Sequence, residues 1–173
     1  MAESTFELKS LSWEWTAESD EDSLHEGFGL SFQEGQPLTT KEALAQIDQL
    51  AALGSQQVCI AGGPVFYRDD WQTLAAALRD HGVHLSLVSN GDGVCEAVDT
   101  LATYFDGVAV TLDGTETVHD MIHQRTGSFD RALDALERLV GAGVYAGVIT
   151  TLSNHNLLEL DAHGQRGLHA RHG

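Results

Sequence analysis

The chain has 173 residues, the length of one domain that buries roughly 70% of its unfolded surface. Its 26 acidic and 9 basic residues give a net charge of −17. This balance argues against nucleic acid and anionic membrane surfaces as partners, because phosphate groups require a positive protein surface. The acids are spread along the whole chain, which favours a halophilic protein over an ordinary acidic one, since concentrated salt screens the self-repulsion.

We expect a cytoplasmic protein, because the sequence shows no targeting signal and its cysteines are too few and too scattered for a disulfide framework. The first residues are polar and acidic and lack the apolar segment of a signal peptide. The apolar run at 144–152 is far too short to span a bilayer. Cys59 and Cys95 lie in separate patterned segments, so we expect two reduced thiols that behave as small buried hydrophobes.

The first part of the chain predicts a strand followed by a helix. Near 6–16, Leu11, Trp13 and Trp15 alternate with polar residues, as in a strand. The segment 37–54 carries Thr39 and Glu42 at the spacing of a capping box, followed by one apolar helical stripe and a closing glycine. We therefore expect a helix over most of 37–54.

From there on, strands and helices alternate. Short apolar runs predict strands at 56–63, 83–91, 106–114 and 144–152. Helical periodicity predicts helices at 69–82, 94–105 and 128–143. Asp69 or Asp70 is expected to cap the helix at 69–82, and NHNLLEL (154–160) reads as the start of a helix that is cut short.

This alternation predicts an α/β fold with right-handed βαβ units and a parallel sheet. About five βα units are present, whereas a closed eight-unit barrel takes about 250 residues. We therefore expect a partial (β/α) barrel with outer helices, incomplete at its C-terminal end, spanning 1–160. Residues 161–173 break the pattern and are expected to be a disordered tail rather than a metal site, although three histidines occur there: His163, His169 and His172.

An acidic segment, TAESDEDSLHEG (16–27), directly follows the first expected strand. A calcium loop is one interpretation, but the segment lacks the glycine and the alternating ligand spacing of an EF-hand. A solvated acidic face is the favoured interpretation from charge alone.

Six stretches, in this order and spacing, resemble the core domain of the radical S-adenosylmethionine (radical SAM) superfamily. They are PLTTKEALAQIDQLAALG, AGGPVFYRDDW, LVSNG, VAVTLDG, VHDMIHQRTGSFDRALDALERL and VYAGVITTL, within roughly 11–160. The resemblance is greatest to peptide-maturase-like enzymes with a downstream auxiliary-cluster (SPASM-type) domain, and to their cluster-less haloarchaeal pseudo-radical-SAM relatives. It implies a partial barrel whose first loop carries C-x-x-x-C-x-x-C. Those thiolates hold a [4Fe–4S] cluster that cleaves S-adenosylmethionine to a 5′-deoxyadenosyl radical.

The resemblance places the three cluster-ligand positions on Ser19, Ser23 and Glu26, counted from Thr16. Hydroxyl and carboxylate oxygens do not replace soft thiolates as iron–sulfur ligands. With two cysteines in all, the chain cannot supply three thiolates. We therefore expect no metal ligands here, only vestigial ligand positions.

The resemblance also implies S-adenosylmethionine-binding positions. The family's Gly-Gly-Glu-Pro becomes Gly62, Gly63 and then Pro-Val, so close backbone approach is kept while the carboxylate is lost. Asn90 and Asp113 match polar strand-end positions that face the nucleoside, with simple turn chemistry as an equal alternative. A basic residue for the methionine carboxylate falls on His123, and Arg125 is expected to substitute for it.

The leading functional hypothesis is a non-catalytic binding or partner module with no catalytic residues. Expected partners are an active radical SAM relative, a peptide substrate, or a second copy bound through an exposed sheet edge. One alternative is an active radical SAM enzyme of the peptide- or cofactor-maturation type, with a cluster completed unusually or by a partner chain. A second is a non-functional truncated remnant.

Overall fold

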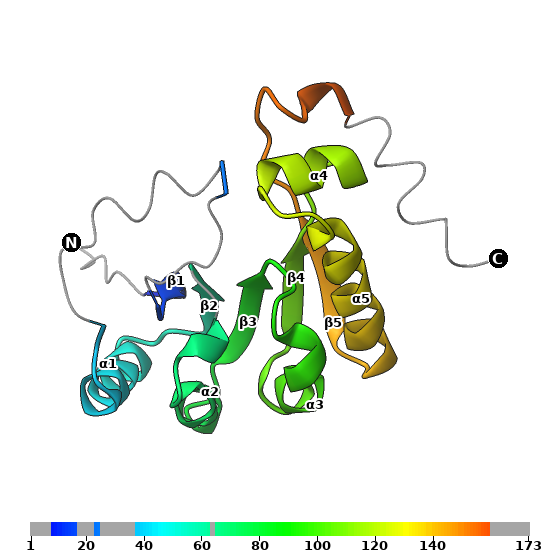
Figure 1. Ribbon diagram of the computed structural model, residues 1–173. Helices are drawn as coiled ribbons and strands as arrows, with labels where there is room; N and C mark the ends of the chain where they lie inside the picture. Colours follow the sequence, from blue (N-terminus) through cyan, green and yellow to red (C-terminus); the bar gives the residue numbers. More distant parts are fainter. Residues whose placement is uncertain (1–7, 17–22, 25–36, 63–64, 160–173) are drawn as a thin grey trace.

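The computed structural model describes residues 8–16, 23–24, 37–62 and 65–159. The chain forms one parallel sheet with its strands in sequential order, β1-β2-β3-β4-β5 (Figure 1). The strands are β1 (Ser10–Glu14), β2 (Gln57–Ala61), β3 (His84–Ser89), β4 (Gly107–Thr111) and β5 (Tyr145–Ile149). This order confirms the predicted α/β architecture of a partial barrel.

Helices connect the strands along one face of the sheet. They are α1 (Thr40–Ala52), α2 (Trp71–Asp80), α3 (Val94–Tyr104), α4 (Glu116–Ile122) and α5 (Ser128–Gly141). Figure 1 shows α1, α2, α3 and α5 on the same side of the sheet, with α4 beyond the carboxyl ends of the strands. None of the described helices is both long enough and apolar enough to cross a membrane.

Most predicted elements are confirmed within a few residues, with two differences. The short helix α4 was not predicted. The expected helix at 154–160 is a 3₁₀ turn, η4 (Leu157–Glu159); a second such turn, η3 (Val65–Tyr67), precedes α2.

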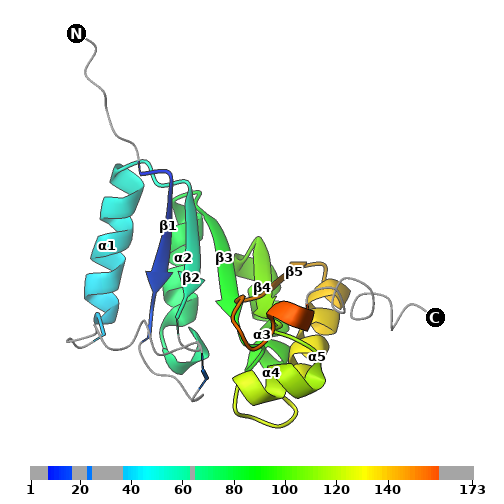
Figure 2. The same ribbon diagram turned by 90° about the horizontal axis from the view of Figure 1, so that it is seen from above.

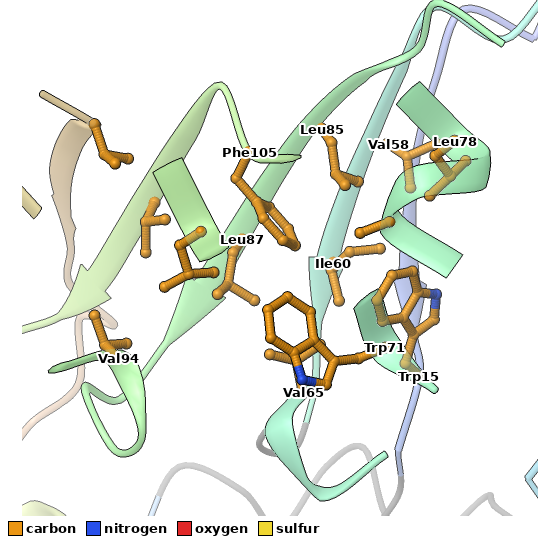
Figure 3. Close-up of a cluster of buried hydrophobic side chains, with 14 of the residues drawn as sticks. Trp15, Val58, Ile60, Val65, Trp71, Leu78, Leu85, Leu87, Val94 and Phe105 are labelled. Atoms are coloured by element: carbon orange, nitrogen blue, oxygen red, sulfur yellow. The ribbon is translucent and has the colours of Figure 1, made fainter. Parts of the chain in front are cut away.

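Alternate strand residues form the hydrophobic core against the helices. Ile60, Leu87 and Val108 lie side by side in register on adjacent strands, and each is almost fully buried. Trp71 and Phe105 close the same layer, with ring centroids 6.4 Å apart (Figure 3). Because this apolar layer lies on one face only, it fixes which face of the sheet the helices cover.

The central strands carry mostly small side chains on the opposite face of the sheet, and Tyr145 of β5 lies beside Gly107 at its edge. Ser12, Cys59, Ser86 and Gly107 form one cross-strand row in register. A Cβ added at Gly147, in β5, would meet nothing within 4 Å, so there is free space at this position. Small residues leave room on the face that would line the interior of a barrel.

The two cysteines are less buried than predicted. Cys59 and Cys95 are free thiols, and both are half-buried rather than fully buried. Cys59 lies on the small-residue face of β2, and Cys95 lies in the first turn of α3 and packs against the core.

The predicted capping box of α1 is confirmed. The Glu42 amide donates to Thr39 Oγ1 at 3.3 Å, and the Thr39 amide donates to Glu42 Oε2 at 2.9 Å. The predicted side-chain cap of α2 is wrong: Asp70 is the N-cap residue, but its side chain makes no capping bond. Instead, the Asp70 carboxylate accepts hydrogen bonds from Arg68 Nε at 2.9 Å and from Arg68 Nη2 at 2.8 Å. These bonds hold the pKa of Asp70 below its usual range.

A side chain from α4 caps helix α5. Gly127 is the N-cap residue of α5 and has no side chain to accept the first amides. The Asp120 carboxylate accepts the amides of Gly127 and Phe129, at 2.6 and 3.0 Å, and the hydroxyl of Ser128 at 2.9 Å. Burial pushes the pKa of Asp120 upward, but these donors outweigh it and the pKa lies below its usual value.

We expect Asp120→Ala to lower the free energy of unfolding by about 1–2 kcal/mol at neutral pH, as loss of a helix cap does. A lowered folded-state pKa stabilises the protein above the unfolded pKa of about 3.9, and this contribution is lost as pH falls below it. The difference between variant and parent in urea unfolding should therefore shrink in acid. Asp130→Ala, on the exposed first turn of the same helix, is the control; an equal loss there would contradict the assignment.

Candidate functional site

The carboxyl ends of the parallel strands meet at one edge of the sheet, next to α4 (Figures 1 and 2). Gly62 follows β2 at this edge with φ +90°. A Cβ there would lie 3.1 Å from the Glu14 side chain and 3.3 Å from the Thr16 carbonyl oxygen. Only glycine lets β2 end this close to β1 without strain. The second predicted glycine, Gly63, lies outside the described residues.

Asn90 and Arg125 both meet Asp92, in the loop after β3. Asn90 Oδ1 accepts the Asp92 amide at 3.0 Å, which is the turn chemistry that was the alternative for this residue. The Asp92 carboxylate pairs with Arg125 Nη1 and with Arg131 Nε, the latter at 3.3 Å. Arg125 therefore pairs with an acid of this chain, and its predicted role toward the methionine carboxylate stays a prediction. Asp92 and Arg131 were not singled out from the sequence.

Asp113 is a buried hydrogen-bonding centre after β4. Its Oδ1 accepts the Thr151 amide at 2.7 Å, and its Oδ2 lies 3.0 Å from His123 Nε2. Its carbonyl oxygen accepts Asn156 Nδ2 at 2.8 Å, and its amide donates to His119 Nδ1 at 3.1 Å. Asp113 therefore joins β4 to α4, to the residue that follows α4, and to the segment after β5. We call these five residues the Asp113 hub.

The hub contains a donor set that is typical of metal sites. Ligand atoms of Asp113, His119 and His123 all lie within 4.8 Å of one another, and the three residues are buried. One carboxylate and two imidazoles are common ligands of zinc and non-haem iron. The geometry has to be tested before such an assignment is made.

Two features of the geometry do not fit a metal ion. The His119 and His123 rings are stacked, with centroids 4.1 Å apart and planes 27° apart, so their nitrogen lone pairs do not converge on one point. His119 Nδ1 also accepts the Asp113 amide, whereas a metal-bound histidine normally donates from its second nitrogen. The three residues are therefore better described as a structural hydrogen-bond network.

Between Thr16 and Pro37, the structure describes two residues of the loop after β1, Ser23 and Leu24. Ser23, one of the three vestigial positions, is half-buried, and the amide of Leu24 donates to the carbonyl of Ile122 at 3.0 Å. This contact places the segment at the C-terminal end of α4, directly before His123. No pattern in the sequence indicated it. Ser19 and Glu26 lie outside the described residues.

A cavity of about 350 Å³ lies where this loop begins and ends. Its walls are Trp15 and Thr16 on one side, residues 37–40 on another, and residues 67–70 on a third. Arg68, in the third wall, donates from Nη1 to the Trp15 carbonyl at 3.2 Å and from Nη2 to the Leu38 carbonyl at 3.1 Å.

The sequence profile of the radical SAM superfamily matches residues 26–164, and the chain belongs to this family. The AdoMet-dependent heme synthase of Methanosarcina barkeri is 31% identical over 154 residues, covering 87% of this chain and 44% of the relative. The mycofactocin maturase MftC of Mycobacterium tuberculosis is 35% identical over 129 residues, covering 72% of this chain and 32% of the relative. The chain thus spans less than half of the length of these relatives.

Solved structures share the fold. "Native anSMEcpe with bound AdoMet" superimposes with a TM-score of 0.67 at 16% identity, covering 82% of this chain and 43% of the other. Streptococcus suis SuiB bound to S-adenosylmethionine gives a TM-score of 0.65 at 17% identity, covering 91% and 37%. At these identities the likeness concerns the partial barrel alone.

Membership of the family implies S-adenosylmethionine and a [4Fe–4S] cluster. The thiol donors of this chain do not fit a cluster held in the family's manner, because three thiolates from the first loop are needed and two cysteines exist. Cys59 lies in β2 and Cys95 in α3, so neither belongs to that loop. Burial also raises the pKa of the Cys95 thiol and disfavours its thiolate.

Because Asp113 satisfies several buried donors, we expect Asp113→Ala to lower the free energy of unfolding by about 3 kcal/mol. A double-mutant cycle with His123→Ala should show a coupling energy above about 1 kcal/mol, since the two side chains share a buried contact. Additive losses would contradict a shared network.

We also expect Zn²⁺ to leave the unfolding midpoint of the parent protein unchanged, because the stacked rings of His119 and His123 do not direct their nitrogens at one point. A clear rise in the midpoint would restore the metal assignment.

Proposed function

We propose that this chain keeps the radical SAM scaffold without holding a [4Fe–4S] cluster of its own, and acts as a non-catalytic binding or partner module. The observation that carries the proposal is the cysteine count: the chain has two cysteines, and Ser19, Ser23 and Glu26 stand at the sequence positions to which the resemblance assigns the three thiolates. The hydrophobic layer and the capping box of α1, which serve the scaffold rather than the reaction, are present. Loss confined to the site indicates a retained scaffold with a changed role.

S-adenosylmethionine is the first ligand to test. Solved relatives of the same fold are described with it bound, and the small-residue face of the sheet leaves space for a ligand. The candidate contacts are Gly62, Gly63, Asn90, Asp113 and Arg125. Asp113 and Arg125 already bind other side chains, so we propose weaker binding than in an active relative.

A cytoplasmic, haloarchaeal pseudo-radical-SAM origin is part of the same proposal. It is supported by the net charge of −17 and by the scarcity of lysine, which occurs only at Lys9 and Lys41. A surface of hydrated carboxylates is suited to concentrated salt, where like charges repel each other over only a few ångströms.

An active enzyme is the second candidate. The matched relatives are named as enzymes: Fe-coproporphyrin III synthase, AdoMet-dependent heme synthase and mycofactocin maturase. In this case a partner chain would supply the missing thiolates, or oxygen ligands would hold the iron. A third candidate, a non-functional remnant, is excluded if the chain unfolds cooperatively in molar KCl.

Anaerobic reconstitution with iron and sulfide separates the first two candidates. We expect the parent chain to take up less than about one tenth of a cluster per molecule, because oxygen donors do not replace three thiolates. The triple variant Ser19→Cys, Ser23→Cys, Glu26→Cys should take up a cluster with its charge-transfer absorbance. It is the matched control for loop geometry.

A stoichiometric cluster in the parent chain, with release of 5′-deoxyadenosine, would refute the binding-module proposal. Equilibrium dialysis with S-adenosylmethionine, without iron, tests the ligand separately. Failure to bind it would leave a partner role as the remaining form of the proposal.

For the partner, we propose a second copy of the chain, an active relative or a peptide at the β5 edge of the sheet. In the described part of the chain, β5 pairs with β4 alone. Exposed apolar side chains lie on β5 and shortly after it: Tyr145, Val148, Ile149 and Leu152. An open strand edge beside apolar side chains favours the addition of another strand.

If two copies pair there, their association should strengthen between 0.1 M and 3 M KCl, because salt screens the repulsion between two acidic chains. Val148→Lys should weaken this association about tenfold or more in sedimentation equilibrium. Leu53→Lys, an equally drastic change at the exposed end of α1, should not. A monomeric parent chain at every salt concentration would leave the relative or the peptide as the partner.

A further inference from the structure

We infer that Arg68 is a positioning residue for the β1–α1 loop, the segment that carries Ser19, Ser23 and Glu26. One guanidinium bonds to the carbonyl of Trp15, just after β1, and to the carbonyl of Leu38, just before the first residue of α1. These carbonyls are 23 positions apart in the sequence. Arg68 therefore holds together the two points where the loop leaves and rejoins the fold.

The side chain is itself held in place. Asp70 accepts two of its donors, Nε at 2.9 Å and Nη2 at 2.8 Å, in the forked geometry that only arginine offers. The side chain of Arg68 is 11% exposed, so water competes little for these bonds. Because Asp70 orients the guanidinium, its remaining donors point at the two loop carbonyls with little freedom to rotate.

The cavity shows why this link matters. About 350 Å³ of space lies between residues 15–16, residues 37–40 and residues 67–70. Across this space the two ends of the loop are not packed tightly against each other. The bonds of Arg68 bridge the space and add a polar link between the two ends, beside the packing of Trp15 in the core cluster that also holds Ala43 and Ile47 of α1.

A second described contact lies within the loop. The Leu24 amide donates to the Ile122 carbonyl at the end of α4. This bond requires Leu24 to lie beside the end of α4, so its persistence reports the position of Leu24. The inference concerns loop geometry and stands whether or not the proposed function holds.

Hydrogen exchange of two backbone amides in one sample tests the inference. Arg68→Lys keeps the positive charge but cannot make the fork and both carbonyl bonds together. We expect protection of the Leu24 amide to fall about tenfold relative to that of Leu87, in the central strand β3. If Arg68 only stabilised the fold as a whole, the substitution would lower the protection of both amides by the same factor.

Two further variants keep the test decisive. Asp70→Asn leaves Arg68 in place but weakens the fork, and we expect a smaller loss at Leu24 in the same direction. Arg79→Lys is the matched control, because Arg79 also pairs with an aspartate and a backbone carbonyl but lies away from the loop. The inference is overturned if Arg68→Lys leaves Leu24 as protected as in the parent, or if Leu24 and Leu87 lose protection equally.

Discussion

One-sided packing of the parallel sheet is the constraint on which the rest of this structure depends. Strands in sequential order, joined by crossovers of one hand, place their helices on the same face. Burial of that face removes the apolar row of Ile60, Leu87 and Val108 from water, at about 25 cal/mol per Å². The other face is thereby left to small residues, and all carboxyl strand ends come to one edge.

Polar contacts organise that edge. Helix α4 has seven residues, too few for a stable helix on propensity alone. Acidic side chains tie it to its surroundings: Glu159 accepts the amide and hydroxyl of its N-cap residue Thr115, and Asp120 within α4 caps α5. Asp113 contributes the buried hub. These bonds act at contact distance, so concentrated salt, which screens distant charges, weakens them little.

The site combines a preserved scaffold with an altered donor set. Gly62 permits the close approach of β1 and β2, and Arg68 bonds to the carbonyls of Trp15 and Leu38 on either side of the loop between β1 and α1. The chain has two cysteines, one in β2 and one in α3, so it does not supply three thiolates to a cluster in the family's manner. Scaffold and reactivity separate in this way because packing depends on shape and burial, whereas iron binding depends on the softness of a few donor atoms.

The sequence alone determined the regular elements and the missing thiolates, because periodicity, the Thr39–Glu42 box and cysteine number are local or countable properties. Only the tertiary structure decided where the polar side chains find their partners. Asp70 was predicted to cap α2 but binds Arg68, and Asp113 binds Thr151 and Asn156 about 40 positions further on. Helix α4 escaped prediction for the same reason. A hydrogen bond between distant segments leaves no local pattern, since folding alone brings its two partners together.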